Sequence, residues 1–251
     1  MSAVPGAVWV TTAAAAGIAA GVPLRAAVFH HAVPAGADWR TACPACGTAV
    51  VRPGWRLLAS GLRPSGRCGS CGSRIGPLGG AVELTGAAVV GLLVWRLGAH
   101  PGTVALVWAG LLGLTLAFVD AAVHRLPDRL VGVALAGTLA ALGAAVATGT
   151  PLARLVTAVA CGLGAGLAYL VPVLAAPGGM GLGDAKLAVL IGLAGGWFGV
   201  RVAVYGIVAG VVLAGFGAAA LLALRRIGRT DRIAFGPYML AGALLAITVL
   251  G

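Results

Sequence analysis

The chain has 251 residues, of which 60% are hydrophobic and 9% charged, with a mean hydropathy of +1.04 and a formal net charge of +11. A soluble domain carries roughly a quarter charged residues, so this composition argues against a water-soluble globular protein. An outer-membrane barrel would show short alternating segments, and the apolar runs here do not alternate. The composition predicts an all-α, polytopic membrane helix bundle.

Eight apolar runs are long enough to cross a bilayer, which takes about 17–25 helical residues. They cover residues 4–24, 79–98, 102–121, 129–148, 153–175, 184–200, 202–223 and 236–251. The first run has no basic residue before it, so it resembles a cleavable signal peptide poorly. We expect two domains: residues 1–78, a membrane helix followed by a polar loop, and residues 79–251, a membrane domain.

The basic residues indicate the orientation, because cytosolic loops of membrane proteins are enriched in Lys and Arg. With both termini outside, the cytosolic segments hold all of the 17 basic residues except Arg96, Arg154 and Arg201. The positive charge is therefore explained by membrane topology, and we expect the lipid bilayer rather than nucleic acid as the partner of these residues.

Two CxxCG motifs lie in the long polar loop, at residues 43–47 and 68–72. Each pair of cysteines can supply two thiolates to one tetrahedral metal ion, and the following glycine permits a tight turn. Two disulfides are the alternative, which a reducing cytosol disfavours. The motifs predict a structural zinc site, with no open position for water, formed by Cys43, Cys46, Cys68 and Cys71. His30 and His31 are expected at the membrane interface rather than on the metal.

Two acids at the ends of apolar runs are candidates for catalysis, because an acid at membrane depth costs about 2.5–3.5 kcal/mol on insertion scales. Asp120 ends the third run and Asp184 opens the sixth, so both are expected at the cytosolic face. Paired carboxylates in a low-dielectric site can share one proton, which suits them to activate water and protonate a carbonyl oxygen. The alternative is that both acids cap helices or pair with arginines.

The sequence before Asp184 is GMGLGD, residues 179–184. Gly181 and Gly183 lack a Cβ atom, so the backbone there can stay irregular and a substrate strand can come close. Lys186, the only lysine of the chain, is expected to mark the cytosolic edge of the membrane. All three residues are candidates for substrate binding.

The combination of motifs resembles the type IV prepilin peptidases, a family of bacterial membrane aspartic proteases. VDAAVHRLPDRLV (119–131) is similar to the family's stretch around its first catalytic Asp, and GMGLGDAKLAVLIG (179–192) to its GxGDxKL stretch. IAFGPYMLAGAL (233–244) resembles its Phe-Gly-Pro segment, and many members carry paired CxxC motifs in the first cytosolic loop.

The resemblance implies that Asp120 and Asp184 form a catalytic pair that cuts the short basic leader from type IV prepilins or pseudopilins, the subunits of type IV pili and related protein-secretion systems. It places the enzyme in the bacterial inner membrane, with its active site towards the cytosol. Asp128 is then expected to be a helix-start residue after Pro127.

Many members also methylate the new N-terminus with S-adenosylmethionine, and Glu83 is the candidate for that activity. The chain departs from the family pattern in residues 21–34, where Arg25 stands in place of an Asn. The alternative for Glu83 is a structural role, in an ion pair with a loop arginine.

Two other classes of function remain open on the sequence. A small proton-coupled transporter would use the buried acids as relays, but it would need acids near the bilayer midplane. A zinc-sensing membrane scaffold would explain the four cysteines and leave the two acids unexplained.

Overall fold

The structure is a computed structural model that describes residues 6–34, 36–51, 64–175, 181–228, 231 and 233–251. All regular secondary structure of these residues is helical, apart from two isolated β-bridges. The eight helices are α1 (Ala7–His31), α2 (Ala81–Leu97), α3 (Pro101–Val123), α4 (Asp128–Ala147), α5 (Leu152–Ala175), α6 (Leu182–Gly196), α7 (Val200–Ala223) and α8 (Gly236–Leu250). The predicted all-α bundle is confirmed, with each helix at a predicted apolar run.

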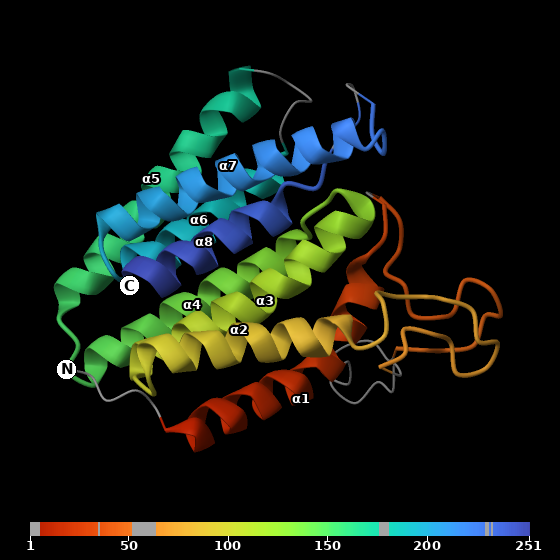
Figure 1. Ribbon diagram of the computed structural model, residues 1–251, viewed down its shortest axis with the longest axis horizontal. Coiled ribbons are helices and arrows are strands. Elements are labelled where there is room, and N and C mark those ends of the chain that lie inside the picture. Colours follow the sequence, from red (N-terminus) through yellow and green to blue (C-terminus); the bar gives the residue numbers. More distant parts are fainter. Residues whose placement is uncertain (1–5, 35, 52–63, 176–180, 229–230, 232) are drawn as a thin grey trace.

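The helices run along the long axis of the molecule, and the loop between α1 and α2 projects from one end (Figure 1). Helices that follow one another in the chain pack side by side in the pairs α1–α2, α3–α4, α5–α6 and α7–α8. Helices α3, α6 and α8 also contact one another, so they connect the two halves of the bundle. Elements far apart in the sequence therefore meet at the centre.

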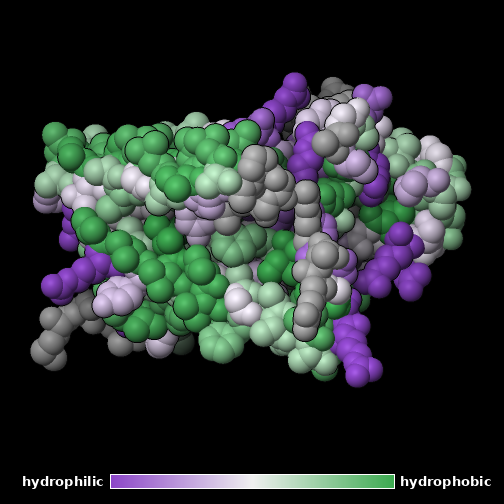
Figure 2. Space-filling view, turned by 90° about the horizontal axis from the view of Figure 1, so that it is seen from above, coloured by the Kyte–Doolittle hydropathy of each residue, from purple (hydrophilic) through white to green (hydrophobic). Residues whose placement is uncertain are grey.

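Among the described residues, five helices are long and apolar enough to cross a membrane: α1, α3, α4, α5 and α7. Helix α8 is a shorter apolar helix, and α2 and α6 have 17 and 15 residues. Large apolar side chains are exposed along the flanks, such as Phe216 at 71% and Leu167 at 65%, and Figure 2 shows an apolar flank beside a more polar end. Such a surface needs a lipid cover in place of water.

The first helix differs from its prediction, because α1 continues to His31 instead of ending near residue 24. Arg25 does not end the helix, since its charge is neutralised within the protein, as described below. His30 and His31 are largely buried in the last turn of α1, where both rings contact the ring of Trp39.

The loop after α1 packs on that helix rather than standing free. Ala26 and Phe29 of α1 form a buried apolar cluster with Val51 and Ile75 and with the buried cysteines. Helix α1 also packs along α2, which lies beyond the expected boundary at residue 78. The division into domains stays a prediction.

Glycines let α7 and α8 approach closely. A Cβ atom on Gly242 would lie 2.2 Å from the backbone nitrogen of Gly210, and one on Gly206 would lie 3.2 Å from the Cα atom of Ala243. This contact fixes α8, whose first residue reaches the site described next.

Candidate active site and metal centre

Asp120 lies in the last turn of α3 and is only 5% exposed. Its Oδ2 atom accepts a hydrogen bond from the backbone N–H of Gly236, the first residue of α8, at 2.8 Å. The amino end of a helix carries a partial positive charge, which stabilises the carboxylate. A Cβ atom on Gly236 would lie 3.0 Å from the same oxygen, so a larger residue would press on the acid.

Asp184 lies in the first turn of α6 and is half-buried. Its Oδ2 atom accepts a hydrogen bond from the backbone N–H of Gly181 at 3.1 Å. The acid thus caps the start of its own helix, as the capping interpretation expects. Its half-buried side chain is still partly accessible.

The two acids come together at the same end of the bundle. Helix α3 runs towards this end and α6 starts from it, and the two helices are in contact. Leu116, one turn before Asp120, and Ala185, next to Asp184, belong to one buried apolar cluster. Asp120 accepts its hydrogen bond from the start of α8, and Asp184 accepts its own from the residue before α6.

Gly181 and Gly183 have different surroundings. Gly181 is exposed beside Asp184, whereas a Cβ atom on Gly183 would lie 2.9 Å from Cβ of Leu126. Gly183 is therefore required for packing α6 against the turn between α3 and α4. Gly179 and Met180 of the same motif lie outside the described residues.

Tyr169 of α5 belongs to the same region and was missed by the sequence analysis. Its side chain is buried at 6% exposure, and its hydroxyl group has no hydrogen-bond partner among the described residues. Tyr169 belongs to the same buried cluster as Ala185, the residue after Asp184, and its ring lies beside that of Phe235. A polar aromatic residue in an apolar helix rich in Ala and Gly is the signal that would have found it.

An apolar cavity of about 370 Å³ begins beside Asp120. Ala121 and Pro237, the neighbours of Asp120 and Gly236 in the chain, line one end. Leu106 and Ile247 line the other end, so the cavity follows α3 and α8 away from the acids. It offers an apolar path that leads into the bundle from the acid site.

Lys186 forms an ion pair with Asp128, with 2.6 Å between Nζ and Oδ1. Both side chains are exposed, at 45% and 77%. Asp128 is the first residue of α4, as predicted from its position after Pro127. The pair links the start of α6 to the start of α4 beside the acid site.

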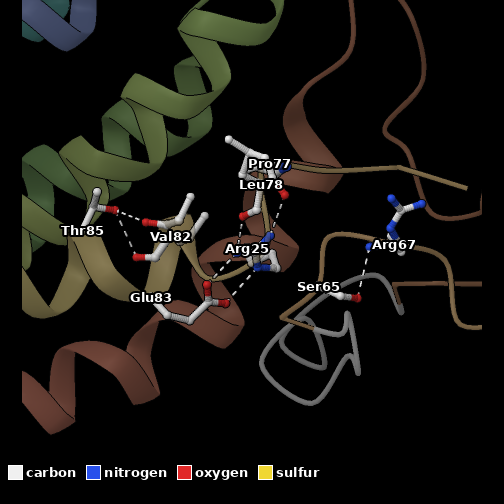
Figure 3. Close-up of polar contacts among 9 residues, drawn as sticks. Arg25, Ser65, Arg67, Pro77, Leu78, Val82, Glu83 and Thr85 are labelled. Carbon is white, nitrogen blue, oxygen red and sulfur yellow. Dashed lines mark hydrogen bonds and ion pairs between the residues drawn. The ribbon is translucent and has the colours of Figure 1, made fainter. Parts of the chain in front are cut away.

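Glu83 of α2 and Arg25 of α1 form a bidentate ion pair (Figure 3). The guanidinium donates from Nε to Oε1 at 2.8 Å and from Nη2 to Oε2 at 2.6 Å, and Arg25 is fully buried. Its remaining N–H groups donate to the carbonyls of Pro77 and Leu78 at 3.0 and 3.1 Å. Glu83 does pair with an arginine, one that lies within α1.

The four loop cysteines converge on one point, with all Sγ atoms within 4.8 Å of one another. The Cys43–Cys71 and Cys46–Cys68 sulfurs are 3.8 and 3.7 Å apart. Four thiolates about 2.3 Å from a tetrahedral zinc ion would be separated by roughly 3.8 Å, so the cluster fits the ion. The cluster found among the described residues contains neither His30 nor His31.

The two CxxCG motifs fold alike. Gly47 and Gly72 have φ angles of +71°, and each donates its N–H to the carbonyl of the first cysteine of its motif. A hydroxyl group follows each motif: Thr48 accepts from the Cys46 thiol, and Ser73 lies 3.5 Å from Cys43 Sγ. The hydrogen bond with Ser73 lowers the pKa of Cys43 to about 6, which favours the thiolate that binds metals.

Two comparisons with known proteins agree with this architecture. The profile of the type IV leader peptidase family matches residues 104–224, which include both Asp120 and Asp184. The prepilin leader peptidase/N-methyltransferase of Pseudomonas aeruginosa is 31% identical over 223 residues, covering 82% of this chain and 70% of the relative. A comparison with solved structures gave no match. The similarity to the relative extends over most of both proteins, and on this ground the chain belongs to the type IV leader peptidase family.

Proposed function

We propose that this protein is an aspartic endopeptidase that removes the leader from type IV prepilins or pseudopilins, with Asp120 and Asp184 as its catalytic residues. The observation that supports this most is that two carboxyl groups, one from the end of α3 and one from the start of α6, lie at the same end of two contacting helices of a membrane bundle. Family membership and the motifs around both acids support the same activity.

In the proposed reaction, the two acids share one proton before the substrate is cut. The ionised carboxylate takes a proton from water as the water oxygen bonds to the scissile carbonyl carbon. The protonated carboxyl donates its proton to the carbonyl oxygen, which gives a tetrahedral intermediate. When the C–N bond breaks, a proton passes to the leaving nitrogen, so one water is consumed and an acid and an amine are released.

The apolar cavity beside Asp120 suits the apolar segment that follows the leader in such substrates. A substrate helix along α3 and α8 would bring its amino end to Asp120 and leave the basic leader in the cytosol. Replacing Ala117, which lines the cavity, by Phe should raise the KM for cleavage, while Ala140→Phe on the exposed side of α4 should not. Equal KM values would rule out this path.

The expected topology places the acid end and the cysteine loop in the cytosol and both termini outside. The grouping of the acid pair, the loop and the connection between α7 and α8 at one end of the bundle supports this orientation. The family supports the bacterial inner membrane as the location.

We propose that the four cysteines bind zinc as a structural site. The donor set and the sulfur separations fit a tetrahedral ion, and four thiolates would leave no position for a reacting water. The ion would hold the two CxxCG turns together, and the loop would in turn keep its contact with α1.

Methylation of the new N-terminus is a second proposed activity, because the relative in Pseudomonas aeruginosa is named as an N-methyltransferase as well. The role of Glu83 in it stays a prediction, and its pairing with Arg25 does not support it, since both carboxylate oxygens are engaged. No group of described residues is identified that would hold S-adenosylmethionine.

The test is co-expression of the full chain with a prepilin reporter, read as a size shift and as the mass of the product's N-terminus. Cleavage by the parent and none by Asp184→Asn would support the peptidase, and one extra methyl mass would demonstrate methylation. A folded parent that leaves several different pilins uncut would overturn the proposal and favour proton relay by a transporter.

A further inference from the structure

A second cavity lies at the end of the bundle opposite the acid pair. It has a volume of about 250 Å³ and is formed where the α2–α3, α4–α5 and α6–α7 turns meet the start of α3. Asp120 lies 19 residues after Pro101 in α3, which at 1.5 Å per residue places the two sites roughly 28 Å apart along the helix. The cavity is therefore separate from the proposed active site.

Two buried side chains that line this cavity carry polar groups without a side-chain partner among the described residues. Trp197 and Thr103 line it and are 4% and 6% exposed. Neither the Trp197 Nε1 atom nor the Thr103 hydroxyl forms a side-chain hydrogen bond with any described residue, and neither atom is fully enclosed by protein. A donor left in such a position favours a ligand that accepts hydrogen bonds.

The indole nitrogen lies against the first turn of α3. A Cβ atom on Gly102 would be only 2.6 Å from Trp197 Nε1, so this glycine makes room for the indole. The amino end of a helix carries a partial positive charge. In α3, Pro101 has no N–H group and Thr103 donates its N–H to the carbonyl of His100, which leaves the N–H of Gly102 as the donor of the first turn beside the indole.

The charged groups of the cavity are all basic. Arg154 and His100 line its rim, and its lining among the described residues contains no carboxylate. All six acids of the chain lie at or beyond the other ends of the helices, in the segments that hold Asp120 and Asp184 or in the connections next to them. Without a carboxylate from the protein, the positive charge here favours an anion from outside.

We propose that this cavity binds a phosphate group. Arg154 would donate to the phosphate oxygens, Trp197 and Thr103 would donate from within, and the first turn of α3 would supply the backbone N–H of Gly102. The turns that form the cavity join apolar membrane helices, so the phosphate of a membrane phospholipid is the expected source. This inference does not depend on the peptidase activity.

The experiment measures lipid binding to the full chain, purified in detergent, by native mass spectrometry. Phosphatidylglycerol is titrated against a diacylglycerol with the same acyl chains, which lacks the phosphate. We expect phosphatidylglycerol to bind at least tenfold more tightly. Inorganic phosphate is then added as a competitor: competition would show that a free anion also fits, and retained lipid binding would identify the phospholipid as the source.

Three variants locate the site. Arg154→Gln should weaken phosphatidylglycerol binding about tenfold, and Trp197→Phe, which keeps the ring and removes its N–H group, about threefold. Arg201→Gln is the matched control, because Arg201 is an exposed arginine at the same end that does not line the cavity. Equal binding of both lipids by the parent, or parental binding by Arg154→Gln and Trp197→Phe, would overturn the proposal.

Discussion

The acid site and the cysteine loop lie at the same end of the molecule but are built in opposite ways. The acid site takes Asp120, Asp184 and Gly236 from three helices, spread over more than a hundred residues, and depends on helix packing. The cysteine cluster uses two copies of one short turn, about 25 residues apart, and each turn is held by its own backbone hydrogen bonds. A local repeat can be recognised without the fold, whereas a site assembled by packing exists only within it.

The largest effect on cleavage is expected from changes to the acid site. Asp120→Asn and Asp184→Asn should each lower the cleavage rate about 10²–10⁴-fold, because each removes one partner in proton transfer. The measurement is the rate of leader removal from a prepilin reporter, with unchanged protein level and melting temperature. Asp128→Asn is the control acid, and a loss as large in that variant would contradict the assignment of the pair.

Changes to the cysteine cluster should lower the stability of the protein and leave the cleavage reaction itself unaffected. Cys43→Ser, or removal of zinc by a chelator, should lower the melting temperature and the protein level, because metal binding contributes on the order of 10 kcal/mol in small zinc-binding peptides. Metal analysis of the parent should give one zinc per chain. If Cys43→Ser abolished cleavage while the melting temperature stayed unchanged, a purely structural role for zinc would be wrong.

The Arg25–Glu83 pair connects the end of the cysteine loop to the first two membrane helices. Arg25→Leu should destabilise the protein by about 3–5 kcal/mol, because it leaves a buried carboxylate without its partner. The double variant Arg25→Leu/Glu83→Leu should recover much of this loss, measured by thermal unfolding in detergent. Equal melting temperatures of the single and double variants would show that the pair is not coupled.

Tyr169 tests whether the acid site extends to α5. Tyr169→Phe removes only the hydroxyl group, and we expect about a tenfold lower kcat with little change in melting temperature. The control is Tyr205→Phe, which removes the hydroxyl group of an exposed tyrosine in α7. A parental kcat for Tyr169→Phe would leave the buried hydroxyl without a role in cleavage.

The smallest effect is expected at the surface beside the acids. Lys186→Gln and Asp128→Asn should each change stability by less than about 1 kcal/mol, because exposed ion pairs contribute little. A large loss of cleavage in Lys186→Gln, without a similar loss in Asp128→Asn, would instead support the predicted role of Lys186 in substrate binding.

The sequence predicted the helices well because each apolar run is long and bounded by charges or glycines. It failed at the end of α1, where Arg25 looked like the start of a loop: a charge inside a helix can be recognised as buried only when its partner is known, and Glu83 is 58 residues away. It also failed to find Tyr169, since the distance from α5 to Asp184 depends on how α5 packs against α6.

The acid site, too, was only partly predictable from the sequence. The GxGD pattern and the acid at the end of the third apolar run predicted two acids at one end of the bundle, but not that Gly236 would donate to Asp120. Gly183 was expected to admit substrate, and the structure instead places Leu126 against it. Motifs identify side chains, whereas backbone donors and close contacts follow from the arrangement of helices.

The contact between Gly236 and Asp120 also has a consequence for biosynthesis. Helix α8 is the last of the described helices to leave the ribosome, and only its arrival brings the N–H group that holds Asp120. A chain inserted as far as α7 carries both acids but lacks this donor and the α8 wall of the neighbouring cavity. The order of synthesis therefore completes the acid site only when α8 packs against α3.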